Sequence, residues 1–211
     1  MKPEHRFHSY VTGATVTVMY FVIQYLIPAI HLHAAIAPYL NPIATILLSV
    51  GTYKLLATML LGTARKVAFV KRHLLGASYL NGTWIGKFST ADASLIYTVE
   101  HFEQTLSSLK IRGKAYTQED KLYAQWNSLA ETIDVSSGVL TYTYNCDKSN
   151  TKVTLQGVCV FHFERINESG PPSTIRGYSA ELLDGDRTEN TETKISEKLV
   201  PFDEALRRAK A

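Results

Sequence analysis

Long apolar runs fill the first third of the chain. Val11–Ile30 is twenty residues without a charged side chain, and a second run, Pro42–Leu61, is interrupted only by Lys54. About twenty helical residues span about 30 Å, the thickness of a bilayer's hydrocarbon core. The pattern predicts a two-helix transmembrane hairpin. A secretory signal peptide is the alternative for the first run, but its length and the second run directly after it disfavour that interpretation.

From Tyr79 onward the pattern changes to short alternating segments separated by turn residues, which is typical of β-strands. Eight strands are predicted: Tyr79–Phe88, Ser94–Gln104, Leu106–Tyr116, Lys121–Ile133, Gly138–Asn145, Lys152–Arg165, Ser173–Leu183 and Thr191–Leu199. Every link is short, so each strand can pair antiparallel with its predecessor. The expected fold is an all-β domain, an eight-stranded antiparallel up-and-down β-barrel whose interior holds side chains or one small ligand.

Two details favour a closed, lipocalin-like barrel. Gly82-Thr83-Trp84 opens the first strand, as in lipocalins, where the indole plugs one end of the barrel. Leu140, Tyr142 and Tyr144 alternate on one face of the fifth strand. After the last strand, Pro201 begins a segment of helix formers with acids first and bases last, which predicts a short terminal helix.

Charge divides the chain in the same way. Residues 1–73 carry seven Lys or Arg against one acid, a net +6, and residues 74–211 carry fifteen against eighteen, a net −3. We therefore expect an anchor segment, 1–73, and a ligand-binding barrel domain, 74–211. Because the basic excess belongs to the anchor, DNA and RNA are not expected partners. The two cysteines, Cys146 and Cys159, fit ordinary thiols of a reducing compartment.

The basic residues also predict an orientation. Lys2 and Arg6 precede the first run, Arg65, Lys66, Lys71 and Arg72 follow the second, and the connection between the runs has neither lysine nor arginine. The positive-inside rule then places both termini in the cytoplasm. Within the second run, Lys54 either extends toward the cytoplasmic face or faces a protein interior, where Thr15 and Thr17 could accept its hydrogen bonds.

Catalytic and metal-binding signatures are missing from the sequence. It has no G-x-S-x-G, P-loop or H-E-x-x-H motif and no C-x-x-C pair, so neither an enzyme nor a cofactor is expected. His31 and His33 have no carboxylate or cysteine near them and are interpreted as part of a polar turn at the membrane interface.

Bases and aromatic residues on neighbouring predicted strands favour binding of an anion that contains nucleobases, since guanidinium groups pair with phosphate and rings stack on bases. The alternative for the Lys110, Arg112, Lys114 run is a solvated outer face. The candidate ligand residues are Arg112, Trp126, Tyr142, Tyr144, Arg176, Tyr178, Arg187 and Thr188.

Three stretches resemble a known family. After two apolar runs come YLNGTWIGKF at Tyr79–Phe88, the alternating Leu140–Asn145, and Gly177-Tyr178 with Arg187-Thr188. Their order resembles the two-transmembrane β-barrel effectors of bacterial cyclic-oligonucleotide anti-phage (CBASS) systems. The family carries a glycine two residues after the Arg-Thr pair, where this chain has Asn190.

The resemblance implies a function. Such effectors sit in the bacterial inner membrane and bind a cyclic dinucleotide that a partner nucleotide synthase makes during infection. They then self-associate and disrupt the bilayer, so the infected cell dies. Two other classes stay open: a membrane-tethered lipocalin-like carrier of a hydrophobic ligand, and a scaffold whose barrel binds another protein. An apolar interior without inward-facing arginines would favour the carrier.

Overall fold

The computed structural model describes residues 3–26, 37–90, 92–149, 153–165, 167, 170–183, 185 and 187–211. The chain divides into two compact units, Met1–Leu74 and Leu75–Ala211. The first contains the helices that follow the apolar runs, and the second contains all eight strands and the terminal helix.

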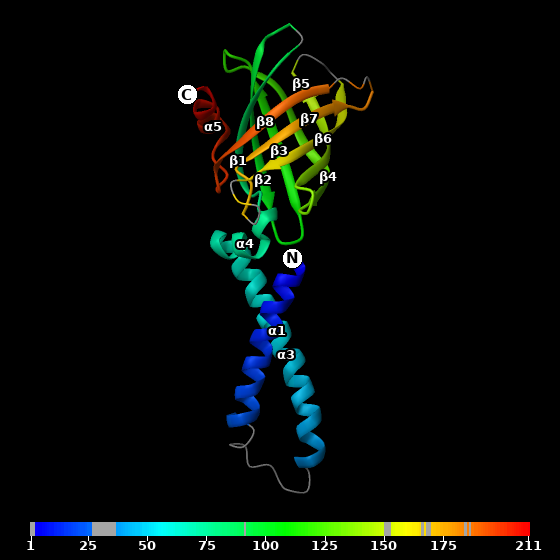
Figure 1. Cartoon of the computed structure of the whole chain (residues 1–211), viewed down its shortest axis with the longest axis vertical. Coiled ribbons are helices and arrows are strands. Elements are labelled where there is room, and N and C mark those ends of the chain that lie inside the picture. Colours follow the sequence, from blue (N-terminus) through cyan, green and yellow to red (C-terminus); the bar gives the residue numbers. More distant parts are fainter. Residues whose placement is uncertain are drawn as a thin grey trace. The chain divides into compact units, whose positions relative to one another are not determined.

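The first unit consists of helices (Figure 1). Helix α1 spans Pro3–Phe21 and continues into the π-helical turn η1, Val22–Leu26; α3 spans Ala37–Lys66, and α4 spans Ala68–Leu75. Among the described residues, one helical segment, Thr45–Ala64, is long and apolar enough to cross a membrane. The last four residues of the expected first span, and both His31 and His33, lie outside the described residues.

Contacts within this unit join α1 to α3. The ring Nδ1 of His8 lies 2.7 Å from the hydroxyl of Tyr53. Lys54 is exposed on α3. The hydroxyls of Thr15 and Thr17 donate to carbonyls one turn earlier in their own helix, at Val11 and Gly13. These hydroxyls therefore bond within α1 in this structure.

The second unit is a closed eight-stranded antiparallel barrel in which each strand pairs with its sequence neighbours and β1 pairs with β8. The expected fold of this part is confirmed. The strands are β1 (Gly82–Ser89), β2 (Leu95–Gln104), β3 (Leu109–Tyr116), β4 (Leu122–Asp134), β5 (Val139–Lys148), β6 (Thr154–Glu164), β7 (Thr174–Glu181) and β8 (Arg187–Ser196).

The last strand begins four residues earlier than the pattern predicts. Arg187 and Thr188 pair with Ala180 and Ser179 of β7, so they belong to the β7–β8 ladder. The chain reverses through Gly185, which has a positive φ of 73° that favours glycine. The ladder resumes at Arg187.

Apolar side chains close one end of the barrel, where β1 begins. The indole of Trp84 is fully buried, donates to the carbonyl of Leu80 at 2.8 Å and lies 5.3 Å from the ring of Phe102. Gly82 is required here: its φ is 135°, and a Cβ would lie 2.0 Å from the carbonyl oxygen of Ser196. The expected tryptophan plug is thus present.

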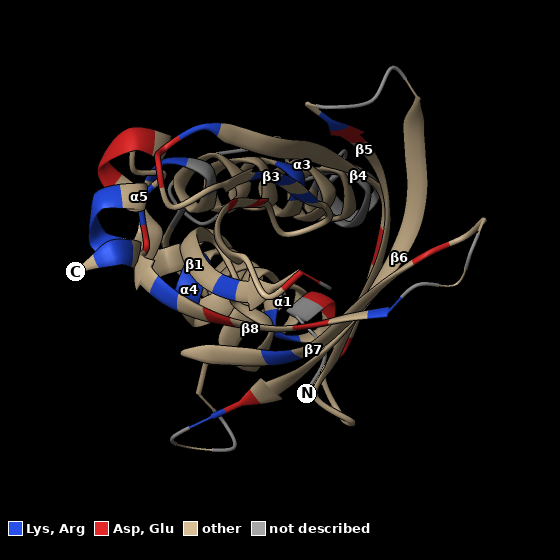
Figure 2. Ribbon diagram, turned by 90° about the horizontal axis from the view of Figure 1, so that it is seen from above, with Lys and Arg blue, Asp and Glu red and all other residues tan. Residues whose placement is uncertain are grey.

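The terminal helix α5, Phe202–Lys210, packs on the outer wall of the barrel against β1 and β2. In Figures 1 and 2 it lies outside the ring of strands beside β1. Its Ala205 and Leu206 are buried with Val99, and the ring of Phe202 lies 4.1 Å from the ring of His101. Both faces of β2 are therefore covered, one by the barrel interior and the other by α5.

Candidate functional site

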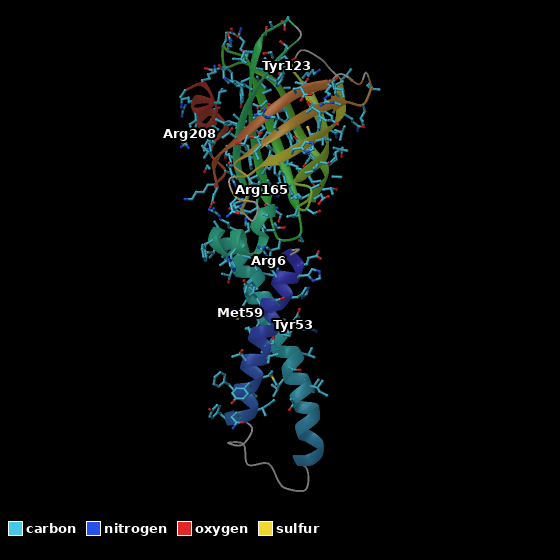
Figure 3. All side chains as sticks on the ribbon, in the orientation of Figure 1. Arg6, Tyr53, Met59, Tyr123, Arg165 and Arg208 are labelled. Atoms are coloured by element: carbon cyan, nitrogen blue, oxygen red, sulfur yellow. The ribbon has the colours of Figure 1, made fainter. Side chains whose placement is uncertain are left out.

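A cavity of about 120 Å³ lies inside the barrel. Its inner part is lined by buried side chains such as Glu100 and Tyr142, and its outer part by half-buried Tyr123, Lys148 and Glu181. These outer residues belong to the start of β4 and the ends of β5 and β7. The cavity therefore reaches solvent at the end of the barrel opposite Trp84. In Figure 3, Tyr123 is labelled near this end and Arg165 toward the other.

Glu100 is the polar centre of the inner part. Its side chain is buried, and its Oε1 accepts from the indole Nε1 of Trp126 at 2.9 Å and from the hydroxyl of Tyr142 at 3.0 Å. Trp126 lies on β4 and Glu100 on β2, with Gly113 of β3 between them in the register. A Cβ on Gly113 would lie 2.0 Å from the indole. The glycine leaves the space through which Trp126 reaches Glu100.

A second carboxyl group is held in the same way. Glu192 on β8 is fully buried, and its Oε1 accepts from Thr98 Oγ1 and from Asn190 Nδ2, each at 2.6 Å. Thr98 lies on β2, and Gly86 of β1 separates the two residues in the register. A Cβ on Gly86 would lie 2.6 Å from the carboxyl carbon of Glu192. A glycine again opens a path across one strand.

Burial changes the charge of these groups. Desolvation raises the pKa of Glu100 to about 7, against the opposing effect of its bonds from Tyr142 and Trp126. Desolvation, and then repulsion from Glu100, raise the pKa of Glu192 well above its ordinary value. Two neighbouring carboxyls of this kind titrate as a pair. Near neutral pH the pair therefore holds at least one proton and offers both a donor and acceptors.

Hydrogen-bonding capacity is left over in this cluster. The Oε2 atoms of Glu100 and Glu192 and the Oδ1 of Asn190 are buried and have no hydrogen-bond partner among the described residues. Glu100 and Asn190 both line the cavity. Buried polar atoms are almost always paired, so these atoms mark a place where a ligand or water supplies the missing partners.

Lys148 is the positive group of the cavity wall. Its Nζ lies 2.6 Å from Glu181 Oε1, and both side chains are half-buried at the rim. Thr188 lines the same region. Both cysteines also line the cavity and are buried as free thiols. A ligand that enters from this end meets Lys148 first and the carboxyl cluster last.

The structure brings half of the predicted ligand residues together. Trp126, Tyr142, Tyr144 and Thr188 all line the cavity. The other four lie on the outer face. There Arg112 pairs with Glu103, Arg176 with Glu164, and Arg187 with Glu189, while the Arg187 guanidinium lies 3.7 Å from the centre of the Tyr178 ring.

Strand parity explains this placement. On β3, the inward residues Leu109 and Ile111 are apolar and buried, so Arg112 has the same outward parity as Lys110 and Lys114. These three residues lie on the outer face, where Lys110 and Arg112 are exposed and Lys114 is half-buried with its Nζ 4.8 Å from the centre of the Phe202 ring. The three arginine side chains are 53–66% exposed, and none of them contacts the cavity. Arg112, Arg176 and Arg187 are therefore residues of the outer face and do not belong to the cavity.

Thr98, Glu100, Lys148, Asn190 and Glu192 belong to the site and were not among the predicted residues. Thr98, Glu100 and Glu192 are polar residues inside predicted strands, which is a signal that could have found them, whereas Lys148 lies in a predicted turn and Asn190 directly before the last predicted strand. Glu100 and His101 are the two polar residues between the apolar Val99 and Phe102. No group of three or more histidine, cysteine, aspartate or glutamate side chains suited to a metal is found in the described part of the chain.

No family model and no curated protein matches this chain. Among solved structures it is similar to a redesigned β-barrel, mFAP1, bound to DFHBI, with 16% identity over 56% of this chain and 98% of that one, at a TM-score of 0.40. A second similar structure, a fluorescence-activating β-barrel designed de novo, shares 12% identity over 56% and 96% of the two chains, at a TM-score of 0.36. The closed barrel is defined by the strand pairing of this chain itself.

Proposed function

We propose that this protein is a membrane-anchored receptor whose barrel binds a cyclic dinucleotide and then drives self-association that disrupts the bacterial inner membrane. The observation that carries the ligand class is the composition of the cavity. Its wall combines aromatic rings, buried carboxyl and amide oxygens without partners, and a lysine at the rim. Nucleobases present flat rings with polar edges, and the backbone of the ligand carries anionic phosphates.

The size of the cavity sets how such a ligand binds. About 120 Å³ is below the range of about 300–1,000 Å³ for whole small-molecule pockets, whereas a cavity of about 150 Å³ is known to hold benzene. In this proposal only one nucleobase inserts between Trp126, Tyr142 and Tyr144, and the cavity widens to admit it. The phosphates and the second base stay at the rim, where Lys148 exchanges Glu181 for a phosphate oxygen.

A carrier of hydrophobic ligands is less well supported. Its interior would be apolar, whereas Glu100 and Glu192 are buried in this barrel, and desolvating an unpaired polar group costs free energy. A fatty-acid tail in the cavity would leave Glu100 Oε2 without a partner.

The membrane part of the proposal rests on the helices. The segment Thr45–Ala64 and the earlier run Val11–Ile30 form two spans, with both termini in the cytoplasm because the flanking lysines and arginines lie on that side. Ligand binding favours self-association only as far as the assembled form binds the ligand more tightly. A nucleotide synthase is the functional partner that supplies the ligand, and the barrel acts as a receptor with no catalytic role.

Calorimetric titration of the detergent-solubilised full-length chain tests the ligand class. The titrants are a panel of cyclic dinucleotides with different bases, the corresponding linear dinucleotides, and a fatty acid. We expect saturable binding of at least one cyclic dinucleotide, weaker binding of its linear form, and none of the fatty acid. Binding of the fatty acid without any cyclic dinucleotide would reject the proposal in favour of the carrier.

A further inference from the structure

Two unpartnered acceptor atoms lie on the wall of the same cavity, Glu100 Oε2 and Asn190 Oδ1. Asn190 donates to Glu192, and Glu192 also accepts from Thr98. Thr98 lies two residues before Glu100 on the inner face of β2. The two acceptors therefore belong to two hydrogen-bonded groups that meet on the inner face of β2, at Thr98 and Glu100.

These two groups fix how each acceptor is presented. Glu100 Oε1 already accepts from Trp126 and Tyr142, so only Oε2 is available to a ligand. Asn190 Nδ2 donates to Glu192 at 2.6 Å, which turns its carbonyl oxygen away from that carboxyl. Glu192 is thus a positioning residue for the amide. Two acceptors held in place require two donors from the ligand.

We propose that Glu100 and Asn190 together recognise the edge of a guanine base through its ring N–H and exocyclic amine. This deepens the proposed function, on which it rests, by naming the base that the cavity selects. Adenine and cytosine present one donor group beside an acceptor, and uracil presents one donor between two acceptors. Guanine alone among these bases has two adjacent donors on one edge.

The same geometry predicts that Glu100 releases its proton when the ligand binds. A donor on Glu100 Oε2 stabilises the ionised carboxylate, whose pKa is raised by burial in the free protein. Binding therefore releases protons from Glu100 near neutral pH, and affinity rises as pH rises through the pKa of the free site. A ligand base that offered no donor there would leave the proton in place.

The direct test compares the cyclic dinucleotide of guanosine with the one of inosine, which lacks the exocyclic amine, on the wild-type full-length chain in detergent. Loss of one hydrogen bond to a fixed acceptor predicts affinity lower by about tenfold or more for the inosine ligand. The uridine ligand should bind more weakly still. Titration in two buffers with different ionisation enthalpies should report proton release with the guanosine ligand.

Variants test guanine selection separately from cyclic dinucleotide binding. Glu100→Gln should lose about tenfold or more in affinity for the guanosine ligand and should abolish proton release. Glu103→Gln, a matched change on the outer face of the same strand, should do neither. Glu192→Gln should lower the ratio of guanosine-ligand affinity to inosine-ligand affinity. This ratio should fall by a larger factor than the affinity for the inosine ligand does.

Each contrary result has a distinct meaning. Equal affinity for the guanosine and inosine ligands on wild type would overturn guanine selection while cyclic dinucleotide binding stood, and this comparison does not depend on any variant folding. Tight guanosine-ligand binding by folded Glu100→Gln would also overturn it. Failure of all the cyclic dinucleotides to bind would reject the proposed function itself.

Discussion

Trp126 donates its indole N–H to Glu100 at 2.9 Å although a strand separates the two residues. The residue between them is Gly113, and the indole occupies the place where a side chain would otherwise be. Glu192 reaches Thr98 over Gly86 in the same manner. The hydrogen bonds from Trp126 to Glu100 and from Thr98 to Glu192 thus each pass over a glycine of the intervening strand.

Gly113→Ala tests this arrangement. The nearest atoms to the added methyl are all in the Trp126 side chain, so the indole has to move and its bond to Glu100 breaks. We expect a destabilisation of about 1–3 kcal/mol from overpacking and a shifted tryptophan emission spectrum, measured by fluorescence during thermal unfolding. Gly62→Ala, at a position with open space, is the control and should change neither signal. An unchanged spectrum in Gly113→Ala would contradict the arrangement.

The buried carboxyls predict a dependence of stability on pH. Between pH 4.5 and about 7, Glu100 keeps its proton in the folded chain and loses it in the unfolded chain. The folded state binds more protons there, so the free energy of unfolding falls as pH rises, by about 3 kcal/mol for a shift of this size.

Glu100→Gln removes the titrating group and keeps its shape, so the fall in stability with pH should become shallower, with Glu192 still contributing in the same direction. Melting temperatures of the two proteins, followed by tryptophan fluorescence from about pH 5 to about pH 8, give the comparison. A wild-type stability that rose across this range would mean that Glu100 is ionised and well solvated.

The strands were predictable because most of them have one buried and one solvated face, and alternation then marks both the strand and its direction. The pattern of β5, with Leu140, Tyr142 and Tyr144 inward, is of this kind. The carboxyl site was harder to predict. On β2 both faces are covered, since α5 packs on Val99 and His101, so alternation does not distinguish the inward Glu100 from its neighbours.

The arginines illustrate a different difficulty. The sequence suggests that positive residues serve an anionic ligand, but strand parity places these three arginines on the outer face. Arg112, Arg176 and Arg187 instead pair with glutamates on the outer face. The contacts from Trp126 to Glu100 and from Glu192 to Thr98 depend on which residues face one another across two strands, and this register is not apparent in any single segment.

Lys148 and Arg187 distinguish the cavity from the outer face. If phosphate binds at the rim, Lys148→Ala should weaken binding of the guanosine cyclic dinucleotide by about tenfold or more, since a charge-assisted bond is lost. Arg187→Ala should leave the affinity unchanged because this side chain lies outside the barrel. Calorimetry on both variants decides the matter. The opposite pattern would place the ligand on the outer face.

Lys54 gives a test of the membrane part. Its side chain is exposed on α3, and we expect it to extend toward the cytoplasmic face. If the chain disrupts the membrane as proposed, Lys54→Leu should insert normally and be as toxic as the wild type. Reporter fusions at Leu75 and within residues 31–36 should report cytoplasm and periplasm respectively. A well-inserted Lys54→Leu protein that no longer kills would show that Lys54 acts in the assembled form. A periplasmic signal at Leu75 would reverse the orientation.

Occupancy of the cavity is the central claim, and the native cysteines report it directly. Cys146 and Cys159 are the only cysteines of the chain, and both line the cavity. Mass spectrometry gives the rate at which a maleimide labels each thiol, with and without the cyclic dinucleotide that binds. The control is Val158→Cys, which places a thiol on the outer face of the same strand as Cys159. We predict that the ligand slows labelling of Cys146 and Cys159 and leaves the thiol at position 158 unaffected. Labelling of both native cysteines that is measurable without ligand and unchanged at saturating ligand would contradict a site inside the barrel.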